Sequence, residues 1–328
     1  MSRHVILGAG VMGLVMASEL VARGEQVQLR DPHLDPGPHA CSWWAGGMLA
    51  PWCERESAEE PVLRLGRESL DWWHRHTGLV MRRGTLVVAP ARDRAELARF
   101  ARRSEGHRVL DAAQLAELEP ALAGRFEQAL FYPDEGNVAP REVLPELRRR
   151  LQKAGAQFTL SDEVPADGPF IDCRGLAARD VLGDLRGVRG EMLYLRCPDI
   201  TLTRPLRLLH PRMPLYIVPR GQGVYMLGGS VIESEATGPV TVRSLLELLN
   251  AAWTVHPAFG EAAVIETGAG ARPAFVDNLP HLRRQGRRLL LNGLYRHGFL
   301  LSPALARMAA DHLLSGTQPE LMQEAATC

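Results

Sequence analysis

The six residues Gly8-Ala9-Gly10-Val11-Met12-Gly13 have the types and spacing that cradle a phosphate group. They follow the apolar residues Val5 to Leu7 and precede the apolar run Leu14 to Ala22, which places them between an expected strand and an expected helix. Glycine permits a tight turn and a close approach of the backbone, and the amides at a helix N-terminus stabilise negative charge. The pattern therefore predicts a dinucleotide site at the start of the chain.

Asp31 adds a carboxylate to this site. Together with Pro32 it follows the next expected strand, Val27 to Leu29, 18 residues beyond Gly13. A carboxylate in that place accepts hydrogen bonds from the hydroxyls of an adenosine ribose. These residues fit NAD as well as FAD, and the alternative is a glycine turn with a purely structural role. The strand, the helix and the acid together favour a bound dinucleotide.

A second segment distinguishes the two dinucleotides: Ser42-Trp43-Trp44-Ala45-Gly46-Gly47-Met48-Leu49-Ala50-Pro51. Its small residues let the backbone lie close to a flat ring system. Together with the glycine turn, it resembles the D-amino-acid oxidase superfamily, and more closely the glycine oxidases of thiamine biosynthesis. Four later segments extend the resemblance, in order, along nearly the whole chain: Val188-Arg189-Gly190-Glu191-Met192, Tyr216-Ile217-Val218-Pro219-Arg220, Gly270-Ala271-Arg272-Pro273 and Tyr295-Arg296-His297-Gly298-Phe299-Leu300-Leu301-Ser302-Pro303.

The resemblance implies that the chain binds FAD. The attachment is expected to be non-covalent, because no cysteine lies between Cys197 and Cys328, the stretch in which related sarcosine oxidases supply theirs. The residues implied are Cys41 and Ser42 at the FAD phosphates, Gly46, Gly47 and Met48 at the flavin ring, and Val164 on the adenine side. The last matching loop adds Arg296, His297, Gly298, Phe299, Leu300 and Leu301.

This last loop has a physical reason to lie at the flavin. It precedes an expected helix, which Ser302 would cap and Pro303 would begin. The first amides of that helix, near Leu300 and Leu301, would stabilise negative charge that develops on a reduced flavin. The alternative is an ordinary connection between a strand and a helix.

Arg272 is the leading candidate for holding a substrate. It stands in a tight turn between Ala271 and Pro273, and its guanidinium can grip a carboxylate with two hydrogen bonds. In the resembling oxidases the matching arginine holds the amino-acid carboxylate, and the tyrosine that matches Tyr216 hydrogen-bonds to it. Arg296, in the flavin loop, is the third candidate. The alternatives are a structural ion pair for Arg272, a core tyrosine for Tyr216 and contacts with backbone carbonyls for Arg296.

The chain departs from the family pattern in several places. Asp31 replaces the more usual glutamate, and Asp172-Cys173-Arg174-Gly175 stands where flavoproteins commonly carry a small Ala-Thr-Gly stretch. The bulk and charge of Arg174 are therefore expected close to a backbone contact with FAD. Trp43 and Trp44 are larger than the residues expected beside a flavin, and they either narrow the site, which favours glycine, or pack beneath the cofactor.

The composition excludes other classes of protein. Lys plus Arg and Asp plus Glu number 38 each, so no excess of charge favours nucleic acid or an anionic membrane. No apolar run approaches the roughly 18 residues that span a bilayer. The five cysteines are scattered without paired spacing, so no metal site is expected. Reduced cysteines without a leader or a membrane segment predict a cytoplasmic protein.

A length of 328 residues predicts two domains. Strand and helix patterns alternate at the start of the chain and return near its end, whereas residues 191–229 predict an antiparallel meander. The predicted fold is α/β, with a Rossmann-like FAD-binding domain interleaved with an antiparallel-sheet substrate domain. The predicted boundaries are 1–78, 136–186 and 266–328 for the first domain, and 79–135 and 187–265 for the second. The acidic stretch Glu54 to Pro61 is expected to form a mobile loop.

The reaction expected from the resemblance is the oxidative deamination of glycine or another small amino acid. The lone pair of the neutral amine assists departure of a hydride from the α carbon to flavin N5, and O2 then reoxidises the flavin to give H2O2. The imine hydrolyses or passes to a thiazole-forming enzyme, as the family implies. A homo-oligomer is neither predicted nor excluded.

Two other functions stay open at this level. One is an FAD-dependent dehydrogenase or sarcosine-type oxidase that takes a larger amine or passes its electrons to another acceptor. The other is a nucleotide-bound structural or sensing protein that no longer performs chemistry, against which Arg272 and Tyr216 argue.

Overall fold

A strand, a helix and a second strand open the chain, as the glycine pattern predicts. The computed structural model describes residues 3–210 and 215–324, and in it β1 (Arg3–Leu7) and β2 (Gln26–Asp31) are parallel neighbours joined by α1 (Val11–Ala22). They belong to a seven-stranded sheet in the order β19-β17-β18-β10-β1-β2-β9. Its other strands are β9 (Gln157–Leu160), β10 (Phe170–Asp172), β17 (His281–Gln285), β18 (Arg288–Asn292) and β19 (Met322–Glu324).

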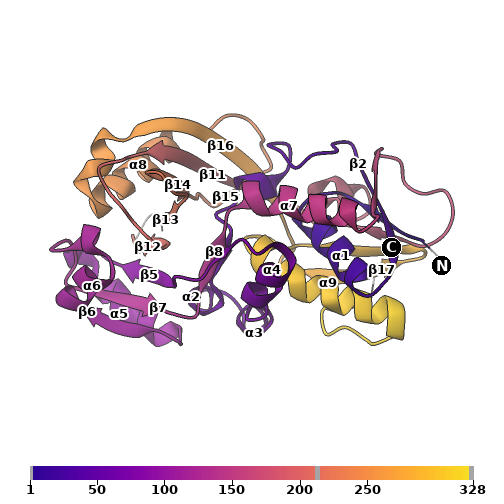
Figure 1. Ribbon diagram of the computed structural model, residues 1–328, viewed down its shortest axis with the longest axis horizontal. Coiled ribbons are helices and arrows are strands. Elements are labelled where there is room, and N and C mark those ends of the chain that lie inside the picture. The colour runs from indigo at the N-terminus through magenta and orange to yellow at the C-terminus, as the bar shows by residue number, and fades with distance from the viewer. Residues whose placement is uncertain (1–2, 211–214, 325–328) are drawn as a thin grey trace.

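Helix α1 lies in the core of this body. All its residues from Val11 to Leu20 are buried, because it contacts β1 and β2 as well as α7 (Pro140–Lys153) and α9 (Gly298–Ser315). A helix that is apolar all round needs such burial on every side. Figure 1 shows α1, α7 and α9 together with β2 and β17 in one half of the molecule, where both chain ends also lie.

A nine-stranded sheet forms the other half. It runs in the order β15-β11-β14-β13-β12-β5-β7-β6, and β16 pairs with β11. Its neighbours are antiparallel except at β5 and β12. The strands are β5 (Thr85–Val88), β6 (Arg108–Asp111), β7 (Gln128–Tyr132), β11 (Arg186–Arg196), β12 (Leu206–Leu208), β13 (Leu215–Pro219), β14 (Val224–Gly228), β15 (Ile232–Glu233) and β16 (Ala263–Ala274).

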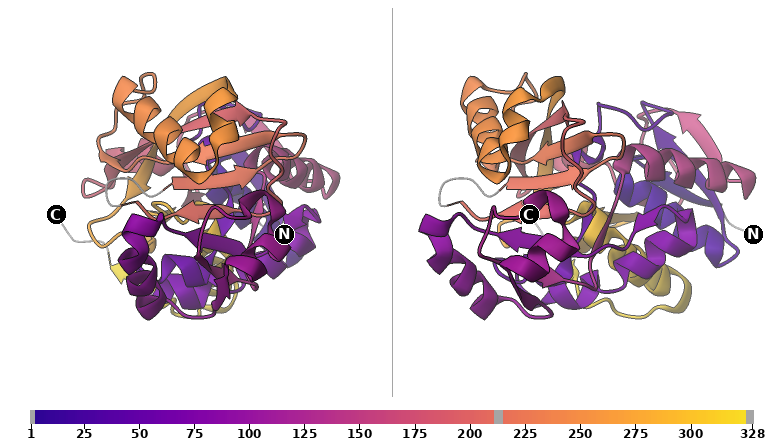
Figure 2. Two further views of the ribbon diagram at one scale, coloured as in Figure 1. Left: turned by 90° about the vertical axis from the view of Figure 1, so that its left-hand side faces the viewer. Right: turned by 60° about the vertical axis from the view of Figure 1, so that its left-hand side comes forward.

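Three helices flank this second sheet: α5 (Arg94–Arg103), α6 (Ala112–Leu118) and α8 (Val242–Val255). In both views of Figure 2 the orange α8 and the purple helices of residues 94–118 lie at opposite ends of this half, with strands between them. The apolar side chains beneath α6 and α8 form a core separate from that of α1, and Leu97 and Phe100 of α5 belong to a third cluster. The mixed α/β fold with a largely antiparallel second sheet agrees with the sequence prediction.

A small third sheet and three short helices join the two halves. The strands β3 (Met48–Leu49), β8 (Gly136–Val138) and β4 (Val80–Met81) pair in that order. The helices are α2 (Pro51–Glu54), α3 (Glu60–Gly66) and α4 (Ser69–Thr77). The expectation of a mobile loop from Glu54 to Pro61 is therefore wrong at both ends, because Glu54 closes α2, where it is buried, and Glu60 begins α3.

Two details bear on the predicted boundaries. Strand β16 pairs with β11 along its length, so the domain boundary predicted at residue 266 falls inside a strand. The division into two interleaved domains stays a prediction. Helix α9 begins at Gly298, so the prediction that Ser302 caps it and Pro303 begins it is wrong. Pro303 is the sixth residue of the helix and cannot donate to the carbonyl oxygen of Phe299, which instead accepts a hydrogen bond from the indole N–H of Trp73 at 2.7 Å.

None of the helices in residues 3–210 and 215–324 combines the length and the apolar character that crossing a membrane requires.

Candidate active site

A cavity of about 800 Å³ runs between the two halves of the molecule. It opens beside the carboxyl ends of β1 and β10, on the two sides of the sheet's change in strand order, which is where open α/β sheets bind their ligands. Most of the predicted site residues line it: Gly8, Gly10, Val11, Met12, Asp31, Pro32, Cys41, Ser42, Gly46, Gly47, Met48, Tyr216, Arg272, Arg296, Gly298 and Phe299. Five do not line it: Gly13, Val164, His297, Leu300 and Leu301.

The glycine turn fits a pyrophosphate group. A Cβ on Gly13 would lie 1.8 Å from the carbonyl oxygen of Gly8, and a Cβ on Gly8 would lie 2.6 Å from that of Cys173, so both positions need glycine. Gly10 faces open space instead, at the N-terminus of α1, which has neither a side-chain cap nor an acidic residue in its first turn. The free amides and the open approach suit a phosphate.

Asp31 is fixed at the adenosine end of the cavity. Its carboxylate oxygens accept hydrogen bonds from the backbone amides of Ala9 and His33, each at 2.7 Å. Each oxygen keeps lone pairs for a further donor such as a ribose hydroxyl. Val164, predicted on the adenine side, is exposed outside the cavity, whereas Ser161 and Asp162 from the same loop line it.

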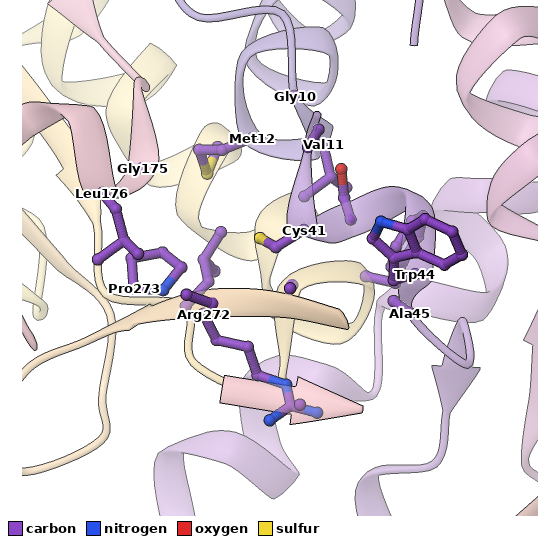
Figure 3. A pocket seen from close by; sticks show the side chains of 18 of the residues that line it. Gly10, Val11, Met12, Cys41, Trp44, Ala45, Gly175, Leu176, Arg272 and Pro273 are labelled. Carbon is purple, nitrogen blue, oxygen red and sulfur yellow. The ribbon is translucent and has the colours of Figure 1, made fainter. Parts of the chain in front are cut away.

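The segment expected beside the flavin passes through the middle of the cavity. Gly47 has φ 68°, and a Cβ there would lie 2.1 Å from the carbonyl oxygen of Val138, so this position also requires glycine. Trp44 lines the cavity with its ring packed against Gly268 of β16, while Trp43 stays outside and lies against the guanidinium of Arg141. Figure 3 shows Trp44 and Cys41 on opposite sides of this segment.

Arg174 does not obstruct the cavity in the way its size suggests. Its guanidinium folds back onto the carboxylate of Asp172, with the closest oxygen at 2.9 Å, and onto Asp180, also at 2.9 Å. Asp172 and Asp180 thereby keep the positive charge of the Arg174 guanidinium at the carboxyl end of β10. Gly175, which follows, lines the cavity directly.

The last predicted loop contributes its first turn of helix to the cavity. Gly298 and Phe299 line it, and no side chain caps the N-terminus of α9. Leu300 and Leu301 are buried in the core. The helix therefore presents backbone amides to the cavity and apolar side chains to the protein, which is consistent with a role in holding an electron-rich group.

Arg272 lies at the end of the cavity away from the glycine turn. Figure 3 shows its side chain extending away from Gly10. The guanidinium crosses Gly190, where a Cβ would lie 1.9 Å from Nη2, and Nη1 donates to the carbonyl oxygen of Ser230 at 3.2 Å. No carboxylate among the described residues forms an ion pair with it. Burial, followed by the neighbouring Arg296, lowers its pKa to about 10, so it remains a cation at neutral pH.

Tyr216 and Arg296 meet at a third residue, Glu54. The hydroxyl of Tyr216 donates to one oxygen of the Glu54 carboxylate at 2.8 Å, and Nη2 of Arg296 donates to the other at 2.8 Å. Glu54 lines the cavity but is only 8% exposed. The part of the cavity lined by Glu54, Tyr216, Arg272 and Arg296 is called the chamber below. It contains the three predicted substrate residues, but within the described residues Tyr216 and Arg272 share no hydrogen bond.

The charges in this chamber are well defined. Burial alone raises the pKa of the Glu54 carboxyl, but attraction to Arg296, with smaller contributions from other neighbours, lowers it to about 2. Burial lowers the pKa of His297 to about 4, so this imidazole is neutral at pH 7 although its Nδ1 lies 3.7 Å from Glu54. Burial also raises the pKa of Tyr216, which keeps its hydroxyl as a donor.

Arg207 of β12 completes the chamber. It is almost fully buried, lies over the rings of Phe100 and Tyr216, and donates to the carbonyl oxygen of Cys53 at 3.3 Å. Its second guanidinium nitrogen lies 3.6 Å from the carboxylate of Glu56.

Glu54 and Arg207 were not among the site residues predicted from the sequence. A signal existed for Glu54, since Pro51 begins a helix directly after the segment expected at the flavin and Glu54 stands one turn later. Arg207 carries no local signal, because its neighbours in the chamber come from distant parts of the chain. The described residues contain no group of three or more His, Cys, Asp or Glu side chains placed to hold a metal ion.

The profile of the family described as FAD dependent oxidoreductase (DAO) matches residues 3–312. A Rhizobium etli protein described as the thiamine biosynthesis oxidoreductase ThiO is 53% identical over 323 residues, which cover 97% of this chain and 98% of that one. A glycine oxidase of Pseudomonas aeruginosa is 27% identical over 368 residues, which cover 97% of this chain and 96% of the relative.

The fold also matches solved structures. The crystal structure of a glycine oxidase from Geobacillus kaustophilus superposes with a TM-score of 0.80 and covers 98% of this chain and 97% of that one, at 22% sequence identity. The agreement extends over both sheets, because almost every residue of either chain is included.

Proposed function

The chain belongs to the family of FAD-dependent oxidoreductases, and we propose that within it the chain oxidises glycine or another small amino acid. Its cofactor is FAD. The observation that carries the proposal is Arg272, a cation inside the cavity without a carboxylate partner among the described residues. A buried arginine without an anion is costly, and a substrate carboxylate supplies the missing charge.

The residues of the chain provide binding and orientation. Arg272 anchors the carboxylate, and its own position is fixed by Ser230 and by the space that Gly190 leaves. Met48, Met192 and Met226 line the cavity nearby and give this part of its wall an apolar surface. The amine must lose its proton before the α carbon can lose a hydride, and His297, neutral but outside the cavity lining, is not placed to accept that proton. Positioning therefore accounts for most of the catalysis by the chain.

FAD supplies the redox chemistry when bound, accepting a hydride from the α carbon at N5 and passing electrons to O2 to give H2O2. The residues that would hold it are those of the glycine turn, Asp31, the segment from Cys41 to Met48 and the first turn of α9. We propose that it is held without a covalent bond, so that denaturation releases it. Flavin that stays with the precipitated chain contradicts this.

The product has a proposed destination. The name of the Rhizobium etli relative refers to thiamine biosynthesis. We propose that the imine formed here supplies the thiazole branch of that pathway and passes to a thiazole-forming enzyme. A cytoplasmic location is part of this proposal.

Anaerobic spectroscopy tests the function. Adding glycine to the purified, FAD-loaded protein is expected to bleach its visible flavin absorption, and admitting air to restore the colour with release of H2O2. Sarcosine and D-alanine serve as comparison substrates. A yellow protein that glycine does not bleach, while sarcosine or another amine does, assigns the chain to a different amine.

A further inference from the structure

The chamber around Tyr216 contains more arginines than one substrate carboxylate requires. Arg207, Arg272 and Arg296 all line the cavity. Two of them have carboxylate partners, Glu54 at 2.8 Å from Arg296 and Glu56 at 3.6 Å from Arg207. His297 and Tyr216 are neutral at pH 7. Glu56 is shared with Arg103, also at 3.6 Å. Of the three arginines that line the cavity, Arg272 is the one that has no carboxylate partner among the described residues.

Glu54 is held rigidly in this arrangement. Each of its carboxylate oxygens has its own donor, Tyr216 or Arg296. The preceding residue, Cys53, is held from two sides: its amide donates to the buried carboxyl of Glu135 at 2.7 Å, and its carbonyl accepts from Arg207. The negative charge therefore cannot withdraw from the chamber when a ligand enters.

This geometry has a consequence for ligand charge. An anion bound at Arg272 gives a partner to the one arginine of the cavity lining that has none among the described residues. A second anionic group on the same ligand, directed toward Arg296, meets a cation that is already paired and a fixed carboxylate that repels it. Like charges brought together in a water-excluded site are strongly unfavourable.

We propose that Glu54 is a specificity-determining residue that limits the chamber to substrates with one carboxylate. Amines with a single carboxylate, such as glycine, enter, and amines with two, such as iminodiacetate, are excluded. This inference rests on the proposed function, since it assumes that Arg272 binds the substrate carboxylate. It adds a charge filter to the Arg272 anchor, by which we mean that the Glu54 carboxylate disfavours ligands with a second anionic group.

Replacing Glu54 by glutamine removes the charge and keeps the shape. The Glu54→Gln side chain still accepts the Tyr216 hydrogen bond through its amide oxygen. Arg296 loses its counter-ion and becomes a second anion subsite. Glu54→Asp keeps the charge, and Glu60→Gln removes an exposed carboxylate of α3 that pairs with Arg64 and does not line the cavity, so these two variants are the controls.

The test is a binding titration that needs no turnover. FAD-loaded wild type and variants are titrated with acetate and with malonate, which carry one and two carboxylates and no amine, and the flavin absorption spectrum reports binding. The measured quantity is the ratio of the Kd for malonate to the Kd for acetate. In Glu54→Gln this ratio is expected to fall about tenfold or more, while Glu54→Asp and Glu60→Gln stay close to wild type.

The outcomes separate the two proposals. An unchanged ratio in an FAD-loaded Glu54→Gln protein, or an equal change in Glu54→Asp, overturns the charge filter even if glycine is oxidised normally. A changed ratio in a protein that does not oxidise glycine supports the filter and contradicts the proposed function. If acetate perturbs the flavin in none of the proteins, both the Arg272 anchor and the filter are overturned.

A second variant covers the case in which Glu54→Gln does not retain FAD. Arg296→Gln lowers the charge of the chamber by one and leaves Glu54 in place. The malonate-to-acetate ratio is then expected to rise. A fall in this variant contradicts the proposal.

Discussion

The two ends of the cavity are built in different ways. The nucleotide end is a run of backbone turns, in which Gly8 and Gly13 are required because a Cβ would strike a carbonyl oxygen. The substrate end is an assembly of charged side chains, in which Arg296 is paired with Glu54 and Arg272 is unpaired among the described residues. The first end depends on shape and the second on charge balance. The two should therefore respond differently to substitution.

The largest effect is expected at the nucleotide end. In Gly13→Ala the new Cβ would lie 1.8 Å from the Gly8 carbonyl oxygen, and the turn must open. We expect a loss of about 3 kcal/mol or more in the free energy of unfolding, together with loss of bound FAD. Urea unfolding and the flavin absorption of the purified protein measure both. Gly183→Ala, at a glycine whose Cβ would meet open space, is the control; equal stability of the two variants contradicts the shape argument.

At the substrate end, Arg272→Met is expected to leave FAD bound and to reduce kcat/KM for glycine about 100-fold or more, because the substrate carboxylate loses the arginine that has no carboxylate partner among the described residues. Steady-state H2O2 release measures this. Arg284→Met, at an exposed arginine of β17, is the control and is expected to match wild type. Normal turnover of glycine by FAD-loaded Arg272→Met eliminates the carboxylate anchor.

A smaller effect is expected from Tyr216→Phe, which removes one of the two donors to Glu54. Loss of a hydrogen bond to a charged group is expected to reduce kcat/KM for glycine about tenfold. Tyr225→Phe also removes a buried hydroxyl, in this case one that donates to the carbonyl oxygen of Ile200 away from the cavity. It should lower stability without changing the kinetics, and equal kinetic losses in the two variants would show that the effect is structural.

The smallest effect concerns pH. Burial lowers the pKa of His297 to about 4, so the folded protein resists protonation while the unfolded chain takes up a proton below its ordinary pKa of 6.5. Stability therefore falls as the pH drops from 6.5 toward 4, by about 1 kcal/mol by pH 5.5 for this group. Urea unfolding at pH 7.5 and 5.5 should show a smaller decrease in His297→Asn than in wild type. A decrease of the same size in both proteins excludes His297 as its source.

The nucleotide end and the substrate end of the cavity also differ in how much of them could be predicted from the sequence. The turn from Gly8 to Gly13 and the strand and helix around it are confirmed, because each depends on neighbours within a few residues. The start of α9 was predicted wrongly, since Ser302 and Pro303 are usual helix-start residues but the chain is already helical at Gly298. Packing of the apolar first turn into the core outweighed the local signal.

At the substrate end, the sequence indicated the residues but not their partners. Tyr216, Arg272 and Arg296 were selected by resemblance, and all three line the cavity. Glu54 was assigned to a mobile acidic stretch, because a glutamate among other acidic residues is usually solvated. The hydrogen bonds that bury it come from Tyr216 and Arg296, which lie 162 and 242 residues away along the chain.

The sequence by itself determined the dinucleotide turn, the identity of the family and the residue types available to the site. Only the tertiary structure decided which charges neutralise each other, that Arg174 folds back onto Asp172 and Asp180, and that Arg272 is left as the cation available to a ligand. The physical reason is the distance along the chain between the residues that determine each feature. A backbone turn is fixed by the conformations that adjacent residues permit, whereas the charge balance of a buried chamber depends on side chains that only folding brings within a few ångströms of one another.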